Sequence, residues 1–576
     1  MIGLFQKIFK LTFKFDKIGV IKFNIILILS SLIEGLSIAL IFPILGLISK
    51  DQNSLIFFEK IPFFDFEQSD TILIALIALF LIFLIKSLLL LFFSWWKSGF
   101  IFKINNGFST QVFKNYIYEN YEFFLKNKPS LLLRNSYNEI RVFIQAVDLF
   151  FKLLIEVFIL LVISLVLFYF YPRITIIIFL MFSFLGFTFL ILTKNSYKSW
   201  SLKKLNFSGK LIQILQQSFE TIKYLKISNS QNKVLDDYNF NIKNFSKYTR
   251  YSLFFSEIPR NLFELFGVLA LVITVFFLIN ISNIETTELL PSLGLFGAAS
   301  FRIIPGINRI INLSQSIYST NASIMTVYND LTNLKKVDDD NEFKKIPFEK
   351  SIKFRNVSYK YPNSNYFTIK DLSFEIKKND CICLVGESGI GKTTLIDLIS
   401  GLISPSSGQI LVDNKELKNE IKIKNWQRNI GYVPQTVVLY NASILENITY
   451  GKKSDKINKK LLSDSISLSG LNEFVLSKKE GVEFQISERG SNLSGGQIQR
   501  FAIARSLYLN PEILICDEFT SALDEKNQEK ILNSLNKLVG RNTLIFISHN
   551  NKVIKKANKI LKLKKNTNNE TIIENE

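Results

Sequence analysis

Residues 383–395 read CLVGESGIGKTTL, an apolar run followed by a glycine-rich turn, a lysine and two threonines. The spacing G-x-x-x-x-G-K-[ST] after a strand lets backbone N–H groups surround the β-phosphate of a nucleotide. Lys392 can reach the β- and γ-phosphates, and the Thr393 hydroxyl can hold Mg²⁺. The helix expected after the loop adds the positive end of its dipole to the same site. The stretch therefore predicts a nucleotide-binding α/β domain.

A second apolar run, EILICDE at residues 512–518, ends in two carboxylates. Asp517 can bind Mg²⁺ through water, and Glu518 can orient or polarise the water that attacks a phosphate. In isolation this pair would be interpreted as an ordinary acidic strand end. With the glycine-rich loop present, it is the expected partner strand of a phosphate site.

His549 is the only histidine in the chain and lies in TLIFISHN, residues 543–550, directly after another apolar run. Such a position suits a side chain that donates a hydrogen bond to an anion near neutral pH. A histidine buried in the core is the alternative.

The composition indicates more than one domain and contact with lipid. The chain has 576 residues, too many for a single hydrophobic core. Hydrophobic residues make up 48% of it, and 54 residues are phenylalanine, which favours lipid as the surroundings of one part. The net charge of +20 could reflect nucleic acid, an anionic membrane surface or the cytosolic loops of a membrane protein. The three cysteines lie in apolar runs of the C-terminal third, which indicates reduced thiols in the core of a cytosolic domain.

The N-terminal part carries six apolar stretches, each long enough to cross a membrane as a helix of about 20 residues. Lysines precede the first stretch, and the long polar segments 97–150 and 194–260 are rich in Lys and Arg. By the positive-inside rule, the N-terminus and both polar segments lie in the cytoplasm. These segments account for much of the net charge, so we expect no nucleic-acid partner. The predicted spans are 20–49, 72–96, 151–171, 173–193, 261–281 and 286–312.

The chain divides into four parts by composition. The segment at 326–350 is charged and lacks a core pattern, which is typical of a linker. From residue 351, short β-rich runs alternate with helical stretches, which predicts an α/β domain with a largely parallel sheet. The polar end, KNTNNETIIENE, favours disorder. We therefore expect a transmembrane domain at 1–325, a linker at 326–350, a nucleotide-binding domain at 351–565 and a tail at 566–576.

A further motif, LSGGQ at residues 493–497, is followed by DEFTSALD at 517–524. Together with the phosphate loop, these stretches strongly resemble the ATP-binding-cassette (ABC) family. The resemblance covers the whole chain, because six spans fused to one cassette is the arrangement of an ABC exporter half-transporter. It implies an α-helical polytopic membrane domain fused to a cytosolic α/β P-loop ATPase domain, with ATP and Mg²⁺ as cofactors. It also implies a homodimer, in which the LSGGQ signature of one cassette closes on the ATP held by the other.

The same resemblance implies roles for individual residues. Gln435 in GYVPQ matches the loop that senses Mg²⁺, and Tyr361 in YKYP matches the aromatic residue that stacks on adenine. His549 matches the switch histidine that bonds the γ-phosphate, and Asp524 matches the loop that signals between the two sites. The implied catalytic residues are Glu518, His549 and Gln435, and the implied Mg²⁺ ligands are Thr393, Gln435 and Asp517. The implied ATP contacts are Tyr361, Gly386, Glu387, Ser388, Gly389, Ile390, Gly391, Lys392, Thr393, Thr394, Ser494, Gly495, Gly496 and Gln497.

Ionisable residues inside the predicted spans are costly in lipid and are often functional. Arg302 and Arg309 lie seven positions apart in FRIIPGINRII, on roughly one face of a helix. In a dimer, the cations of both copies could line a cavity around the axis. The alternative is that they pair with Glu34 or Glu264 and only satisfy buried charge. The candidate cavity residues are Lys86, Arg260, Arg302 and Arg309.

The stretch of the sixth span and the spacing of these basic residues are similar to the lipid-linked oligosaccharide flippases of bacterial N-glycosylation. This similarity implies a polyprenyl-pyrophosphate oligosaccharide as substrate, with arginines meeting the pyrophosphate. We expect an ATP-driven exporter or flippase in the bacterial inner membrane, with a cytosolic N-terminus and ATPase domain. Two alternatives stay open: an exporter of a plain lipid or peptide, and an ATP-gated regulatory membrane protein without transport.

Overall fold

The chain forms two compact units in a computed structural model. One unit comprises Met1–Glu119 and Asn127–Val337, and the other comprises Asn120–Lys126 and Asp338–Glu576. The structure describes residues 2–39, 68–170, 172–280, 286–333, 344–362, 364, 366–452, 457–487, 490–519, 525–565 and 571–575.

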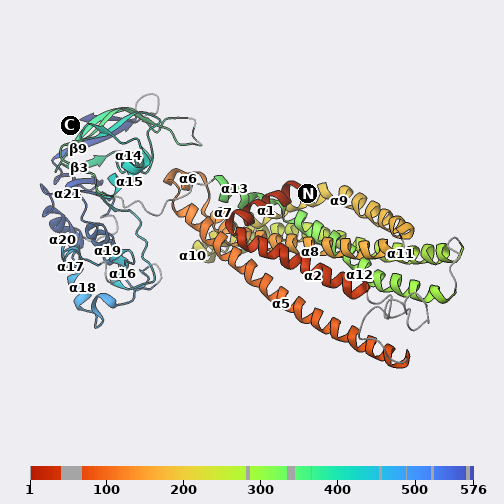
Figure 1. Ribbon diagram of the computed structural model, residues 1–576. Helices are drawn as coiled ribbons and strands as arrows, with labels where there is room; N and C mark the ends of the chain where they lie inside the picture. Colours follow the sequence, from red (N-terminus) through yellow and green to blue (C-terminus); the bar gives the residue numbers. More distant parts are fainter. Residues whose placement is uncertain are drawn as a thin grey trace. The chain divides into compact units, whose positions relative to one another are not determined.

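The first unit is built from long helices (Figure 1). Within the described residues, six helices have 23 or more residues, and each contains or overlaps one predicted span. They are α2 (Lys17–Ala39), α5 (Gln68–Ile117), α8 (Ile140–Phe170), α9 (Pro172–Glu220), α11 (Gln231–Asn280) and α12 (Thr286–Ser319).

Four stretches of these helices meet the length and hydropathy of a membrane span, among the residues that the structure describes. They are Lys17–Ser37, Leu76–Ile117, Pro129–Tyr169 and Phe179–Glu220. The fifth and sixth predicted spans fall on α11 and α12. The end of the first predicted span, 40–49, and the loop at 281–285 lie outside the described residues.

Three of the helices are much longer than a bilayer is thick. Helices α5, α9 and α11 have 50, 49 and 50 residues. At the usual rise per residue each is about 75 Å long, against a hydrocarbon core of about 30 Å. The polar segments 97–150 and 194–260 therefore contain continuations of these helices beyond the thickness of a bilayer. Shorter helices complete the described part of this unit: α1 (Ile2–Phe15), α7 (Pro129–Arg134), a π-helix (Asn135–Glu139), α10 (Ile222–Ile227) and α13 (Asn321–Asn333).

The long helices pack side by side. Helix α9 runs along α11, and α8 runs along both α12 and α2. Phe182 of α9, Phe263 of α11 and Ile311 of α12 form one buried apolar cluster where three of the helices meet. Apolar side chains thus hold the helices together, while many others stay exposed on the outer surface, as expected of a surface that faces lipid.

The second unit contains a ten-stranded sheet in the order β5-β4-β1-β2-β10-β9-β3-β8-β7-β6 among the described residues. Strands β9, β3, β8, β7 and β6 are parallel to one another, whereas β1 is antiparallel to β2 and β4. The prediction of a largely parallel sheet therefore holds for one half of it only. The strands are β1 (Ser351–Tyr359), β2 (Ile369–Lys377), β3 (Cys381–Val385), β4 (Ser407–Val412), β5 (Lys415–Glu416), β6 (Ile430–Val433), β7 (Ile513–Asp517), β8 (Thr543–Ile547), β9 (Lys559–Lys565) and β10 (Thr571–Asn575).

The C-terminal end corrects the sequence prediction of a disordered tail. Residues 571–575 form strand β10, which pairs antiparallel with β9 and parallel with β2 at Thr571 and Ile369. Backbone hydrogen bonds to two neighbouring strands stabilise this short segment, although its own composition is polar.

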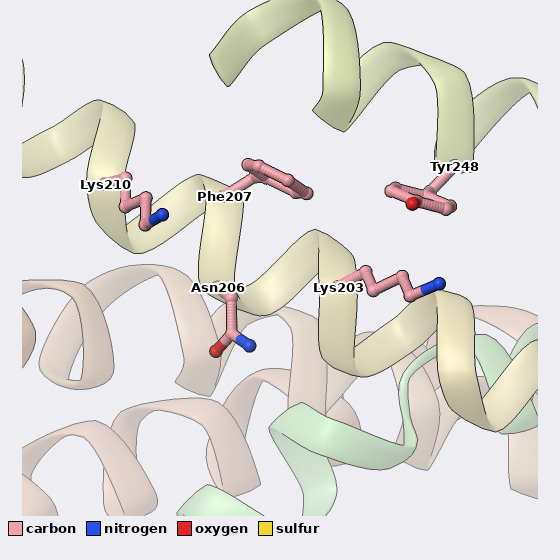
Figure 2. Close-up of a pocket in the computed structure, with 5 residues that line it drawn as sticks. All are labelled: Lys203, Asn206, Phe207, Lys210 and Tyr248. Atoms are coloured by element: carbon pink, nitrogen blue, oxygen red, sulfur yellow. The ribbon is translucent and has the colours of Figure 1, made fainter. Parts of the chain in front are cut away.

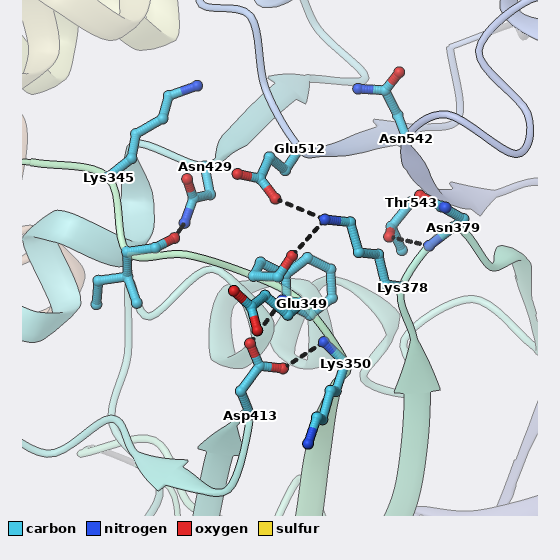
Figure 3. A network of polar contacts seen from close by, with 12 residues as sticks. Lys345, Glu349, Lys350, Lys378, Asn379, Asp413, Asn429, Glu512, Asn542 and Thr543 are labelled. Atoms are coloured by element: carbon cyan, nitrogen blue, oxygen red, sulfur yellow. Dashed lines mark hydrogen bonds and ion pairs between the residues drawn. The ribbon is translucent and has the colours of Figure 1, made fainter.

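The start of β1 is held by the carboxylate of Asp413, in the turn between β4 and β5 (Figure 3). Its oxygens accept hydrogen bonds from the backbone N–H groups of Glu349, Lys350 and Ser351, at 2.7, 2.7 and 2.9 Å. Burial alone would raise the pKa of Asp413, but these three backbone donors lower it below its ordinary value. The first strand therefore begins at a defined place in the sheet.

Helices cover the sheet and form a second core with it. They are α14 (Lys392–Ile399), α15 (Glu420–Gln427), α16 (Ile444–Thr449), α17 (Lys459–Leu468), α18 (Asn472–Leu476), α19 (Gly495–Tyr508), α20 (Glu525–Asn536) and α21 (Asn551–Ile554), with α6 (Tyr121–Lys126) in the same unit. Cys381, Cys383 and Cys516 are buried free thiols in one apolar cluster, as predicted from their apolar runs. Burial raises the pKa of the Cys381 and Cys383 thiols to about 11, so they are neutral core residues.

Candidate nucleotide site

The glycine-rich loop joins β3 to α14 and takes a shape that needs its glycines. Gly389 and Gly391 have φ angles of +78° and +102°, in the left-handed region that side chains rarely adopt. A Cβ on Gly386 would lie 2.8 Å from the carbonyl oxygen of Leu563, so a larger residue does not fit there either. Glycine at these positions lets the backbone adopt the tight turn that brings N–H groups to a phosphate in such loops.

Lys392 opens α14 and reaches back over the loop. Its Nζ donates to the carbonyls of Gly386 at 2.6 Å and Glu387 at 3.0 Å, and lies 3.3 Å from Nε2 of His549. Burial lowers the pKa of Lys392, while the nearby carboxylates of Glu518 and Asp517 oppose that shift. The ammonium is therefore directed at the loop, where phosphate oxygens can replace the carbonyls as its partners.

The two carboxylates at the end of β7 are each held by a side chain from the β6 segment. Gln435 Nε2 donates to Glu518 Oε2 at 2.7 Å, and the Tyr432 hydroxyl donates to Asp517 Oδ2 at 3.3 Å. Burial raises the pKa of Asp517, and the charge of Glu518 adds to that effect. Glu518 has a φ of +43°, a conformation that is costly for a residue with a side chain and is common at active sites.

The sheet explains why residues so distant in sequence meet. Strands β3, β8, β7 and β6 are adjacent and parallel, and Lys392, His549, Glu518 and Gln435 each follow the carboxyl end of one of them. In α/β sheets, ligands bind outside the carboxyl ends of parallel strands. The sequence predictions for these four residues thus fall on a single edge of the sheet.

The fit of a Mg²⁺ ion to this edge can be judged from the donors present. Thr393, Gln435 and Asp517 offer oxygen atoms, the kind of ligand that Mg²⁺ prefers. Among the described residues, no three or more His, Cys, Asp and Glu side chains form a metal site by themselves. A buried carboxylate with a raised pKa beside a second carboxylate is stabilised by a cation. These residues fit a Mg²⁺ ion that takes its remaining ligands from phosphate and water.

Two other predicted ATP contacts, Tyr361 and Ser494, are held by hydrogen bonds of their own. The Tyr361 hydroxyl shares a hydrogen bond of 3.0 Å with Thr394 Oγ1, and its ring meets that of Tyr359 at a centroid distance of 5.1 Å. Ser494 caps helix α19, accepting from the backbone N–H of Gln497 at 3.3 Å, while Gln497 Oε1 accepts from the Ser494 N–H at 2.9 Å. The signature motif therefore forms the start of a helix that packs on α16 and α17. Asp524 lies outside the described residues.

The candidate cavity residues of the membrane helices are mostly paired. Lys86 and Arg302 both meet the carboxylate of Glu34, at 3.3 and 2.9 Å, and Lys86 also donates to Ser37 Oγ at 3.0 Å. Arg309 Nε lies 2.7 Å from Glu156 Oε1. The pairing of Arg302 with Glu34 is the alternative that the sequence left open.

Neither of the two remaining charged residues takes part in this pairing. Arg260 and Glu264, both on α11, make no ion pair with another described residue.

Sequence reasoning missed three residues near the phosphate site. Tyr432 lies in the GYVPQ stretch itself, three positions before Gln435, so its proximity to Asp517 could have been inferred from the strand register. Asp397 lies on the helix that follows the phosphate loop, and burial together with the Asp517 charge raises its pKa to about 6. Thr571, in the supposed tail, donates to the loop carbonyl of Ile390 at 2.5 Å.

A separate cavity of about 400 Å³ lies between α9 and α11 (Figure 2). Lys203, Asn206, Phe207, Lys210 and Tyr248 line it. Lys203 Nζ lies 4.9 Å from the centre of the Tyr248 ring, and Lys210 Nζ lies 5.8 Å from that of Phe207. Contact with the faces of these rings explains the positions of both ammonium groups, so we assign no ligand to this cavity.

Comparison with known proteins supports the assignment of a nucleotide site to the second unit. Residues 369–521 match the family model described as ABC transporter. An ATP-dependent lipid A-core flippase of Bordetella avium is 32% identical over 268 residues, which cover 46% of this chain and 45% of that protein. A putative export ATP-binding/permease protein of Rickettsia typhi is 30% identical over 373 residues, covering 64% of this chain and 63% of that protein. An alpha-hemolysin translocation ATP-binding protein of Escherichia coli is 38% identical over 211 residues, covering 36% and 29%.

The matched segments thus cover less than two thirds of each of these relatives. The similarity in structure extends further than the similarity in sequence. A bacterial Atm1-family ABC exporter with ATP bound superposes with a TM-score of 0.79 at 19% identity, over 95% of this chain and 93% of that one. The chain therefore has the fold of an ABC exporter, with a domain of apolar helices followed by an α/β ABC ATPase domain.

Proposed function

We propose that this protein is an ATP-driven exporter, which couples ATP hydrolysis to the movement of a substrate across a membrane. The observation that carries the proposal is the group of four side chains at the carboxyl ends of β3, β8, β7 and β6. Lys392, His549, Glu518 and Gln435 meet there, at 3.3 Å and 2.7 Å between neighbours, in a chain that also has apolar helices of membrane-spanning length.

In this proposal each of the four side chains has its own task. Lys392 and the loop N–H groups bind the β- and γ-phosphates, and His549 donates to the γ-phosphate from the adjacent strand end. Glu518 orients and polarises the attacking water. Gln435 donates a hydrogen bond to Glu518 Oε2 and keeps that carboxylate at the strand end. Mg²⁺ held by Thr393, Gln435 and Asp517 would neutralise charge on the phosphates.

A second copy of the chain completes each site in this proposal. Ser494 caps α19, and Gly495, Gly496 and Gln497 form its first turn, where the helix dipole favours an anion. The signature motif of one copy would contact the γ-phosphate bound by the other, so the working form is a homodimer. Mass measurement in detergent tests this part. A monomer whose specific ATPase activity does not change on dilution would contradict it.

For the substrate we propose an amphiphile, and more specifically a polyprenyl-pyrophosphate oligosaccharide. The name of the Bordetella avium relative, a lipid A-core flippase, supports a lipid-linked substrate. Lys86, Arg302 and Arg309 offer cations in the helices, although Glu34 and Glu156 neutralise part of that charge. Guanidinium groups suit a pyrophosphate because they bind two oxygens at once. We place the protein in the bacterial inner membrane, with the N-terminus and the cassette in the cytosol.

The substrate proposal is tested by substrate-stimulated ATP hydrolysis in proteoliposomes. A lipid-pyrophosphate glycan, a phospholipid and an unfolded peptide are added separately at equal concentration. The proposal expects stimulation by the glycolipid and less by the other two. Stimulation by the peptide alone would favour the second candidate, a peptide exporter, which the alpha-hemolysin translocation relative supports by its name. ATP-dependent gating without movement of any amphiphile would favour the regulatory alternative.

A further inference from the structure

The C-terminal hairpin of β9 and β10 lies directly against the phosphate loop. Strand β9 pairs with β3, the strand that leads into the loop, and Thr571 of β10 pairs with Ile369 of β2. A Cβ built on Gly386 would lie 2.8 Å from the Leu563 carbonyl oxygen of β9, so the backbones of loop and hairpin are in contact. The first turn of the loop therefore packs on the end of the chain.

The other end of the loop rests on the neighbouring strand. A Cβ on Gly391 would lie 3.4 Å from Thr368 and 3.6 Å from Ile369, at the start of β2. Ile369 is also the residue that pairs with Thr571. Strands β2, β10 and β9 are adjacent in the sheet, so both ends of the loop lie on one surface.

Thr571 makes a direct bond to the loop from this surface. Its side chain is 2% exposed, and its Oγ1 donates to the carbonyl of Ile390 at 2.5 Å. Ile390 and Thr571 are 181 positions apart, so this contact depends on the hairpin and not on local sequence. The bond occupies the carbonyl of the residue just before Gly391 and Lys392.

Because the peptide bond is planar, the hydrogen bond to the Ile390 carbonyl also fixes the direction of the Gly391 N–H. The C=O of Ile390 and the N–H of Gly391 belong to one trans peptide unit, so they point in opposite directions. A donor that holds the carbonyl towards the hairpin also holds the Gly391 N–H away from it. The hydrogen bond further polarises the amide, which makes that N–H a better donor.

We propose that Thr571 is a positioning residue of the nucleotide site, which directs the Gly391 N–H towards the bound phosphates. The inference rests on the proposed binding of ATP by this loop. It assigns a role in nucleotide binding to a segment whose polar composition gave no sign of one.

The test compares variants that differ in this one hydrogen bond. Thr571→Val keeps the shape and the β-branching but removes the donor, and Thr571→Ser keeps the donor and loses a methyl group. The matched control is Thr449→Val, because Thr449 is also buried and its Oγ1 donates to the backbone carbonyl of Leu445 at 2.8 Å, in helix α16. Thr571→Ala is the second variant if valine is not accommodated.

Binding of ATP is measured on the full chain in nanodiscs with EDTA, so that no turnover occurs, alongside thermal unfolding without nucleotide. The wild type should bind ATP, and Thr571→Val should bind it about three- to tenfold more weakly, the amount expected for one hydrogen bond. Thr571→Ser should stay within about twofold of the wild type. Thr449→Val should lower the unfolding temperature as Thr571→Val does, yet bind ATP like the wild type.

Three results would overturn the inference. They are unchanged affinity in Thr571→Val and Thr571→Ala, equal weakening in Thr571→Ser, and equal weakening in Thr449→Val. A wild type that binds no ATP would overturn the proposed function and this inference with it. Wild-type binding together with any of the three results would overturn the inference alone.

Discussion

At the scale of single residues, the polar groups of the nucleotide site are partners of one another. Lys392 donates to two loop carbonyls, and Gln435 donates to Glu518. A buried polar group without a partner costs about 1–3 kcal/mol, so these contacts stabilise the site before nucleotide arrives. In the proposed ATP-bound state, phosphate oxygens would replace the two loop carbonyls as hydrogen-bond partners of Lys392.

Glu518 and His549 are both expected to act on turnover, and Glu518 is not expected to act on ATP binding. Glu518→Gln keeps the size and the contact with Gln435 but removes the charge that polarises water, so ATP hydrolysis should fall at least about 100-fold. His549→Ala should lower hydrolysis in the same direction, because it removes a donor next to Lys392. ATP binding by Glu518→Gln, measured by equilibrium dialysis, should stay within about threefold of the wild type, because Glu518 acts on the attacking water and not on the phosphates. Wild-type hydrolysis in both variants would show that the site is misassigned.

Asp397 should destabilise the native state near neutral pH. Its pKa is about 6 against an ordinary 3.8, because of burial and the charge of Asp517. The native state therefore binds more protons than the unfolded state between these values, and the free energy of unfolding falls as pH rises through that window. Asp397→Asn should be more stable than the wild type at pH 8, by up to about 3 kcal/mol, and equal to it near pH 4.

Thermal unfolding of the full chain in EDTA, followed from pH 8 to pH 4, measures this difference. An offset between Asp397→Asn and the wild type that does not change with pH would contradict the predicted titration.

At the scale of secondary-structure elements, the start of β1 depends on one carboxylate. Asp413 accepts three backbone N–H groups, and its lowered pKa means that this stabilisation is present above about pH 4 and is lost as pH falls through its folded value. Asp413→Ala should lower the free energy of unfolding by about 1.5–3 kcal/mol at pH 7, as for hydrogen bonds to a charged group. Asp413→Asn keeps one oxygen, so its free energy of unfolding should lie between those of the wild type and Asp413→Ala. Chemical denaturation that gives the same midpoint for all three would contradict this role.

Several elements of the cassette could be predicted from the sequence because local and global signals agree. Strands β3, β7 and β8 are largely apolar runs, buried except for the last residue of β3, and each leads into a motif with its own chemistry. Strand β10 could not be predicted, because its stability comes from pairing with β9 and β2, and not from its own composition. The contact of Thr571 with the phosphate loop could not be predicted for the same reason, because its partner, Ile390, lies 181 positions away.

In the membrane helices, the charged residues and the possible pairing with Glu34 could be predicted, but the choice between pairing and a substrate cavity could not. Arg302 and Arg309 share a helix, yet they meet carboxylates on two different helices, α2 and α8. Pairing of this kind depends on how helices pack, and helical periodicity alone carries no information about it. The choice between a substrate cavity and ion pairs could therefore not be made from spacing.

At the scale of the whole molecule, one carboxylate connects three membrane helices. Glu34 of α2 meets Lys86 of α5 and Arg302 of α12. Glu34→Gln leaves both cations without their counter-charge, so the free energy of unfolding should fall by about 3–5 kcal/mol, seen as a lower unfolding temperature in detergent. Glu264→Gln is the matched control, because Glu264 is exposed and makes no ion pair with another described residue. Equal unfolding temperatures for the two variants would contradict a structural role for Glu34.

The proposed function requires that ATP hydrolysis in the second unit drives transport by the first. The most direct measurement follows a fluorescent lipid-pyrophosphate glycan across the bilayer of proteoliposomes that contain the wild type or Glu518→Gln. The wild type should move the glycolipid only with ATP and Mg²⁺, at a rate that rises with hydrolysis, and Glu518→Gln should bind ATP and move none. Equal movement by both proteins, or a wild type that hydrolyses ATP and moves no amphiphile, would contradict the claim.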